Sequence, residues 1–344
     1  MFLKKNKVLR KIFFLIIASC LICPFDLLAV DSSVRIEMER NTRKEVRVAI
    51  TPFFHHKVTD SEGLGMEARE ILKNDLRLSE MFVQIEPEVY EKLEQKERGK
   101  REVDLWAWHQ TGAQWLVKTE YSIISRGQMS LVFRLYDTVS EKFLLGKRYF
   151  ISANKLLPKV VHRYADELVL KLTGKRGVAE TKIAFLSKEN QGQEINVIDF
   201  DGGNQRQITN DKTLNLTPTW SPNGRWLVYT SYGGNNPDLI MIDSLGKKPK
   251  KTLLHLPGLN AAPSWSPVDD RLSLVLSKDE NSEIYTLSNE RVLRRLTQHF
   301  NIDTSPSWSH DGKKIVFISD RSGRGAPQIY IMDARLGDKA GVER

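Results

Sequence analysis

The sequence predicts an α/β (α+β) N-terminal domain followed by an all-β β-propeller that is incomplete. Two observations predict this order. Apolar residues in the N-terminal half alternate at strand spacing and recur at helix spacing, as they do when helices pack on one small mixed sheet. The C-terminal half repeats a tryptophan-containing segment at intervals of 45 and 43 residues, which is typical of propeller blades.

The basic charge is concentrated at the N-terminus. The chain has 52 Lys+Arg and 43 Asp+Glu, a net charge of +9. About half of this excess lies within residues 1–29, which contain five basic residues and one acidic residue. The net positive charge of the remaining residues is small and spread along the chain, so we expect no nucleic-acid partner.

Residues 1–29 have the pattern of an export signal. A basic start precedes the apolar run Ile12–Ile22, and a small residue follows at Ala29. We expect cleavage there and a periplasmic protein. Two alternatives stay open: an uncleaved anchor, and a lipoprotein signal ending at Cys20. Both cysteines of the chain lie in this segment, so cleavage after Ala29 would leave no disulfide and no thiol chemistry.

Residues 30–44 are expected to form an arm, and 45–175 a small α/β domain. In the arm, Val34, Ile36 and Met38 alternate with charged residues, which indicates an extended strand. The domain is expected to contain strands at 45–52, 82–85, 115–124, 129–137 and 143–152, and helices at 65–78, 103–111 and 157–172. The charged stretch 91–102 is expected to be a solvated loop or helix face, and Gly174 to end the last helix.

Residues 182–344 repeat a unit of four short strands. Three units have a Pro-x-Trp-Ser segment, and its tryptophan (Trp220, Trp265 or Trp308) is expected to pack between blades. The first unit lacks this segment. The last unit is expected to end at Asp333, followed by a polar tail, so about three and a half blades are predicted.

These units, with Ile315–Asp333 as the best example, resemble the blades of the TolB family. The order of signal peptide, arm, α/β domain and propeller agrees with that family over nearly the whole chain. The resemblance implies a non-enzymatic periplasmic component of the Tol–Pal system, linked to outer-membrane integrity and cell division. It also implies a six-bladed ring, which residues 182–344 are too short to build. We expect either a truncated product or fragment, or an open stack of blades with exposed edges.

The resemblance implies two protein partners, the peptidoglycan-associated lipoprotein Pal at the propeller mouth and TolA at the arm. The mouth is expected at the loops that lead into the innermost strand of each blade. Hydrogen-bonding side chains are found there at Asn215, Thr217, Asn260, Asp303 and Ser305. The alternative is that they are ordinary turn residues. The arm contacts are expected at Asp31, Val34, Ile36 and Met38, through addition of a strand to the partner.

Two alternative functions for such a chain are the propeller domain of a hydrolase or peptidase and a ligand-binding periplasmic propeller. The sequence has no Gly-x-Ser-x-Gly nucleophile elbow and no His-Glu-x-x-His zinc motif. We therefore expect no catalytic residue, cofactor, metal site or small-molecule substrate.

Overall fold

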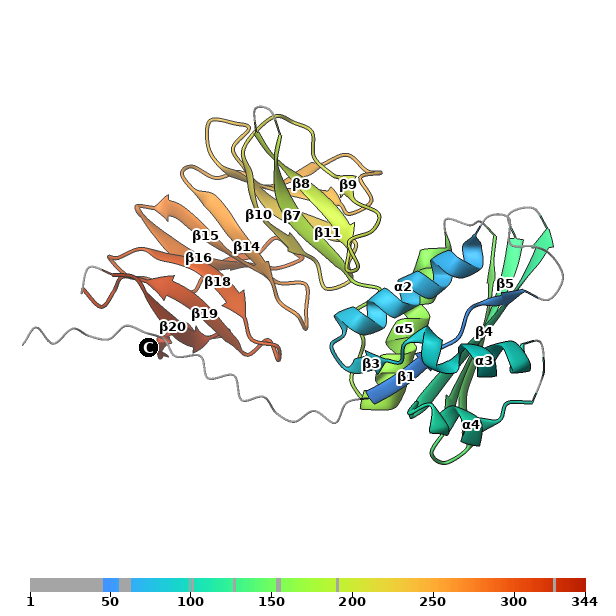
Figure 1. Ribbon diagram of the computed structural model, residues 1–344. Coiled ribbons are helices and arrows are strands. Elements are labelled where there is room, and N and C mark those ends of the chain that lie inside the picture. Colours follow the sequence, from blue (N-terminus) through green and yellow to red (C-terminus); the bar gives the residue numbers. More distant parts are fainter. Residues whose placement is uncertain are drawn as a thin grey trace, which may run out of the picture. The chain divides into compact units, whose positions relative to one another are not determined.

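The N-terminal part of the structure, a computed structural model, is built on one mixed sheet (Figure 1). The structure describes residues 46–344 apart from 56–62, 99, 101, 126–127, 153–155, 190–191 and 324–325. The strand order is β3-β1-β4-β5-β6, and β2 pairs with β4. The strands are β1 (Val46–Ile50), β2 (Phe54–His55), β3 (Phe82–Gln84), β4 (Trp115–Ser125), β5 (Gln128–Asp137) and β6 (Lys142–Ile151).

Helices cover both faces of this sheet and create two separate apolar cores. On one face, Leu72 of α2 and Leu168 of α5 pack with Phe133 of β5. On the other face, Tyr90 of α3 and Trp108 of α4 pack with the sheet. Because each helix has one apolar stripe, burial of that stripe on the sheet is what holds it in place. The helices are α2 (Leu64–Leu78), α3 (Pro87–Glu97), α4 (Leu105–Gln110) and α5 (Leu157–Thr173).

The predicted elements of this part are confirmed, and most of their ends agree within one to two residues. Gly174 ends α5, as predicted, with φ 72°. The stretch 91–102 was only partly predicted, since α3 occupies its first half and buries Glu94 and Glu97. A buried carboxylate needs partners. Glu97 has them: its Oε2 accepts hydrogen bonds from Trp108 Nε1 (2.8 Å) and Lys118 Nζ (2.7 Å).

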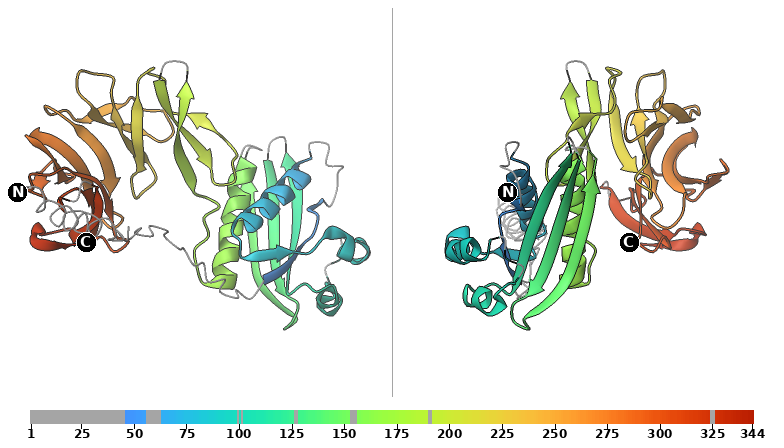
Figure 2. Two further views of the ribbon diagram at one scale, coloured as in Figure 1. Left: turned by 60° about the vertical axis from the view of Figure 1, so that its left-hand side comes forward. Right: turned by 90° about the vertical axis from the view of Figure 1, so that its right-hand side faces the viewer.

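The C-terminal part consists of four antiparallel sheets packed face to face, which are the blades of an incomplete propeller (Figure 2). We call them blade 1 (β7–β9), blade 2 (β10–β13), blade 3 (β14–β17) and blade 4 (β18–β21). Their strands are β7 (Lys182–Glu189), β8 (Gly192–Asp199), β9 (Arg206–Gln207), β10 (Asn215–Trp220), β11 (Trp226–Ser231), β12 (Asp238–Asp243), β13 (Lys251–Leu254), β14 (Asn260–Trp265), β15 (Leu272–Asp279), β16 (Asn281–Leu287), β17 (Leu293–Arg295), β18 (Asp303–Trp308), β19 (Lys314–Ser319), β20 (Gln328–Asp333) and β21 (Gly337–Glu343).

Blade 4 corrects one prediction about the end of the chain. The residues after Asp333, expected to be a polar tail, form β21 and complete a four-stranded sheet. Gly337 makes the required turn with φ 68°, and Asp338 N donates to Leu296 O of blade 3 at 2.9 Å. Apolar periodicity is weak in β21, since its middle residues are exposed, and for that reason the sequence pattern missed it. The first sheet has three strands, in line with its missing Pro-x-Trp segment.

The repeated tryptophans pack between blades, as predicted. Trp220 packs with residues of blade 1, Trp265 with residues of blade 2, and Trp308 with residues of blade 3. In the last case Trp308 Nε1 also donates to Ser264 O at 3.1 Å. Each tryptophan therefore fastens the inner strand of its own blade to the preceding blade.

The described residues from Val46 to Arg344 belong to one compact unit. Among the residues that the structure describes, no helix combines the length and the apolar character needed for a membrane span.

Candidate partner interface

The candidate interface lies where the innermost strands β10, β14 and β18 begin. Strand pairing places Asn215 opposite Ser231, Asn260 opposite Leu276, and Asp303 opposite Ser319. The loops that lead into the inner strands therefore lie at the same end of the blades as the β11–β12, β15–β16 and β19–β20 connections. This end is called the mouth below.

Asn215, Asn260 and Asp303 occupy equivalent positions, and all three are fully buried. Asn215 Nδ2 donates to Asp211 Oδ1 at 2.8 Å. Asn260 Nδ2 donates to Leu256 O at 2.7 Å, and its Oδ1 accepts from Leu256 N. A side chain that hydrogen-bonds the backbone or a side chain of its own loop restrains the path of that loop. Asn215 and Asn260 therefore shape the mouth from beneath.

Asp303 forms a buried ion pair that joins the start of β18 to the end of β19. Its Oδ2 accepts from Arg321 Nη2 at 2.6 Å, and the Arg321 side chain is itself only 10% exposed. The guanidinium also lies over the rings of Phe317 (5.0 Å) and Tyr330 (5.4 Å). Burial raises the pKa of Asp303, and this outweighs the opposing effects of Ser319 and Arg321.

A β-bulge follows two residues later in each inner strand. The residues at its centre, Thr217, Ala262 and Ser305, have φ of 50°, 49° and 53°, and the strand register shifts around each of them. Each stands directly before a proline. A left-handed conformation is costly for residues other than glycine, and bulges of this kind re-aim side chains next to functional sites. Thr217 and Ser305 are exposed there.

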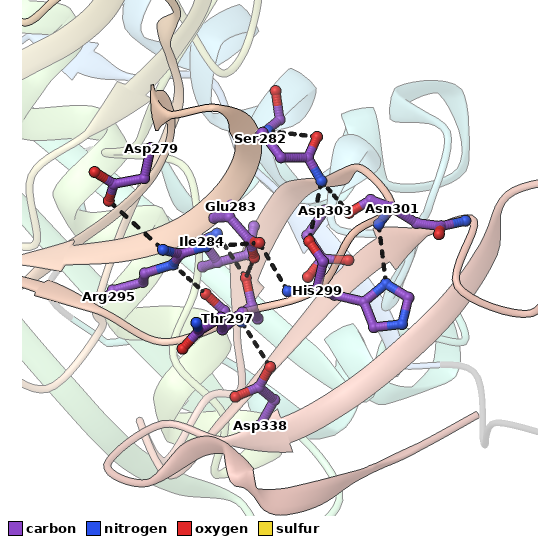
Figure 3. Close-up of polar contacts among 12 residues, drawn as sticks. Asp279, Ser282, Glu283, Ile284, Arg295, Thr297, His299, Asn301, Asp303 and Asp338 are labelled. Carbon is purple, nitrogen blue, oxygen red and sulfur yellow. Dashed lines mark hydrogen bonds and ion pairs between the residues drawn. The ribbon is translucent and has the colours of Figure 1, made fainter.

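Two buried glutamates hold the mouth loops in blades 1 and 3. Glu283 accepts from Thr297 Oγ1 (2.5 Å), His299 N (2.8 Å) and Arg295 Nη2 (2.9 Å), as Figure 3 shows. Glu194 makes equivalent hydrogen bonds in blade 1, where it accepts from Thr209 Oγ1 (2.6 Å) and Lys212 N (2.8 Å). Charge-assisted hydrogen bonds to backbone N–H groups are among the stronger ones. These loops are therefore fixed rather than loose.

The loop of residues 298–302 carries an apolar group that sequence reasoning missed. Phe300 is 87% exposed and stacks on His299 with ring centroids 4.4 Å apart. Ile302 is 53% exposed on the same loop. On either side, Asn281 Nδ2 donates to Asn301 O (2.7 Å), and Asn301 Nδ2 donates to Asp320 O (2.9 Å). The sequence does contain a signal for this group, because Phe300 is a large apolar residue in an otherwise polar connecting loop.

A recess of about 390 Å³ opens between the mouth loops of blades 1 and 2. An ion pair between Asp211 and Lys250 lies on its wall. Although burial acts to raise the pKa of Asp211, hydrogen bonds from Lys250 and Asn215 outweigh it, and the pKa is lowered. The recess is lined by Asp211, Thr213, Ser231, Gly233, Gly234, Asp238, Ile240 and Lys250.

Comparison with known protein families accounts for both parts of the chain. The model of the TolB beta propeller domain matches residues 169–343, and the model of the TolB amino-terminal domain matches residues 34–144. The chain belongs to the TolB family. TolB membership agrees with the resemblance seen in the blade motifs and with an N-terminal α/β part that precedes the propeller.

Curated relatives and a solved TolB structure are similar to the chain. The "Tol-Pal system protein TolB" of Bordetella pertussis is 36% identical over 236 residues, 67% of this chain and 52% of that protein. The "Protein TolB homolog" of Chlorobium luteolum is 31% identical over 70% of this chain and 53% of that protein. The crystal structure of TolB from Acinetobacter baumannii shares the fold, with a TM-score of 0.70 at 24% identity, over 87% of this chain and 71% of that one. This chain spans about half the length of the curated relatives.

The residues predicted for partner binding divide into three groups. Thr217 and Ser305 are exposed at the bulges of the mouth, whereas Asn215, Asn260 and Asp303 are buried beneath it. Asp31, Val34, Ile36 and Met38 lie outside the described residues. Binding through any of these residues stays a prediction. Ala262 was missed because alanine has no hydrogen-bonding side chain, although it occupies the same bulge position as Thr217 and Ser305.

Proposed function

We propose that this chain is a non-enzymatic, periplasmic, protein-binding component of the Tol–Pal system. Family membership supports the proposal, as do relatives named "Tol-Pal system protein TolB". The export pattern of residues 1–29 supports the periplasmic location. In this role the chain links Pal to TolA and contributes to outer-membrane integrity and cell division.

The mouth is proposed to bind a Pal-like peptidoglycan-associated lipoprotein. The observation that carries this is an exposed apolar group, Phe300 and Ile302, on a loop that buried Glu283 holds in place. Interfaces are dominated by a few large, well-positioned side chains surrounded by polar ones. The exposed residues Thr217 and Ser305 supply such polar groups at the neighbouring bulges, and the Thr217 hydroxyl is held by a hydrogen bond with Thr230 Oγ1 (3.1 Å). A preformed surface of this kind loses little conformational entropy on binding.

The arm is proposed to bind a TolA-like inner-membrane protein. The support is the alternation of Val34, Ile36 and Met38 with charged residues, together with Asp31 at the start of the arm. An extended segment with this pattern can add a strand to the sheet edge of a partner. Backbone hydrogen bonds then provide affinity, and the alternate side chains provide specificity.

The mouth is tested with the purified periplasmic domain of Pal and isothermal titration calorimetry. Phe300→Asp should weaken Pal binding at least ~10-fold, because it places a charge in the apolar centre of the contact. Val292→Asp is the matched control: Val292 is 59% exposed, but it lies at the β16–β17 turn, at the other end of blade 3. Equal binding by both variants would contradict the proposal, as would absence of binding by the unchanged chain.

The arm is tested by deletion of residues 30–40 downstream of the signal sequence. TolA binding should be lost while Pal binding keeps its affinity, because the two surfaces are formed by different segments. Far-UV circular dichroism checks that the deleted chain is folded. Retained TolA binding would contradict the role of the arm.

A further inference from the structure

A buried histidine with an unpartnered nitrogen lies among carboxylates that the mouth does not use. His162 of α5 is 3% exposed, and its Nδ1 lies 2.8 Å from Asp75 Oδ2 of α2. Its Nε2 is buried without a hydrogen-bond partner. The nearest charged group on that side is Asp201, in the turn between β8 and β9, with Oδ2 at 3.9 Å. One ligand atom from each of the three residues lies within 4.8 Å of the others.

His162 Nε2 and Asp201 Oδ2 lie 3.9 Å apart, and His162 Nε2 and Asp75 Oδ1 are both buried without a hydrogen-bond partner. When Asp75 Oδ2 accepts a hydrogen bond from Nδ1–H of the neutral imidazole, the lone pair of the ring is on Nε2, which lies 3.9 Å from Asp201 Oδ2. Asp201 Oδ1 is already used, since it accepts from Gly203 N at 2.9 Å, and Oδ2 is the oxygen near the ring. A neutral imidazole nitrogen and a carboxylate oxygen are both good ligands for Zn²⁺.

The charge of the group favours a cation. Two carboxylates, Asp75 and Asp201, share one imidazole, and buried charges require compensation. The other carboxylates nearby are used elsewhere: Asp166 accepts from the backbone N–H groups of residues 179 and 180, and Asp199 pairs with Lys182 and Asn204.

We propose that His162 Nε2 and Asp201 Oδ2 bind a divalent transition-metal ion of the Zn²⁺ class, with water completing its shell. A tetrahedral Zn²⁺ would bring these two atoms to roughly 3.4 Å, about half an ångström closer than they lie here. Asp75 is the positioning residue, because a carboxylate on Nδ1 fixes the tautomer and orientation of a metal-binding imidazole. The ion would fasten α5 to the β8–β9 turn. This inference does not rest on the proposed Tol–Pal function.

The test uses the tag-free full chain with ZnCl₂ in calorimetry and with CoCl₂ as a spectroscopic substitute. One equivalent of Zn²⁺ should bind, and Co²⁺ should give visible absorption typical of nitrogen and oxygen ligands at low coordination number. MgCl₂ should give neither, since Mg²⁺ prefers oxygen ligands and retains its water. Absence of Zn²⁺ and Co²⁺ binding would overturn the proposal and leave a proton as the only cation of this group.

Variants assign the ligands. Asp201→Asn keeps the hydrogen bond to Gly203 and should abolish the Co²⁺ absorption, as should His162→Gln. Asp75→Asn should weaken Zn²⁺ affinity about 10–100-fold. His255→Gln is the matched control, because His255 Nδ1 also lies 2.7 Å from an aspartate, Asp238, but its side chain is 65% exposed. Unchanged Zn²⁺ binding in Asp201→Asn would overturn the proposal. This variant decides the test if His162→Gln does not fold.

Discussion

At the scale of single residues, the mouth depends on buried polar side chains that fix its loops. Three buried side chains lie at equivalent positions of three blades but have different hydrogen-bond partners: Asn215, Asn260 and Asp303. Asn260 bonds the backbone of its own loop and Asn215 bonds a side chain of its loop, whereas Asp303 bonds the cation Arg321 from the connection that follows β19. A buried polar group that loses its partner costs the full desolvation of that group, so these positions are sensitive to substitution.

The Asp303–Arg321 pair gives the sharpest case. Asp303→Asn leaves the Arg321 charge buried without its counter-ion, and the free energy of unfolding should fall by about 3 kcal/mol. The double variant Asp303→Leu with Arg321→Leu removes both charges and should recover part of that loss, since apolar replacements of buried pairs are often tolerated. Urea unfolding of the single and double variants measures both values. A single variant as stable as the unchanged chain would show that the pair contributes nothing.

The acid side of the stability curve should depend on Asp211. Its pKa is lowered in the folded chain, so the unfolded chain binds the proton more readily near its ordinary value of about 3.9. The stabilisation is therefore present above that pH and is lost as the pH falls through the lower folded pKa. Asp211→Asn should flatten the fall in unfolding free energy between about pH 5 and pH 2. Unfolding curves at several pH values test this, and an unchanged slope would contradict it.

At the scale of elements, periodicity and turn residues predicted most of the fold. Strands such as β5 and helices such as α5 bury one clear face, and that face is visible in the spacing of their apolar residues. Three elements were missed in whole or in part, namely α3, β21 and the two-residue strand β2. The apolar signal of α3 is weak because it buries Glu94 and Glu97, and β21 is held by a turn and by backbone contacts with blade 3. At the mouth, the spacing of the repeated tryptophans predicted where the inner strands lie. It did not predict that Asn215 is buried while Thr217 is exposed, because burial there depends on the packing of neighbouring loops.

The docking of β21 is tested at Gly337. An added Cβ there would lie 2.2 Å from Leu296 O, and φ is 68°. Gly337→Ala should therefore cost about 2 kcal/mol or more, through strain and a clash with backbone. Gly246→Ala is the matched control at the equivalent turn of blade 2, where φ is 66° and nothing lies within 4 Å, so it should cost about 1 kcal/mol from strain alone. Chemical unfolding measures both, and equal losses would contradict the docking of β21 on blade 3.

At the scale of the whole molecule, the blades place the mouth loops side by side. Each tryptophan fixes its inner strand to the preceding blade, and each bulge then turns the start of that strand in the same way. The repeat therefore positions Thr217, Ser305 and the Phe300 loop on one end of the propeller, although they are far apart in sequence. This arrangement is the physical basis of the proposed interface with Pal.

The most direct test is hydrogen–deuterium exchange of the chain with and without the periplasmic domain of Pal. Protection on binding should appear in the mouth segments 208–217, 255–262 and 298–305, because a partner seated there excludes water from their backbone. The turns 221–225, 266–271 and 309–313 at the other end of the blades should exchange unchanged. Protection confined to those turns, or none in the mouth segments at saturating Pal, would contradict binding at the mouth.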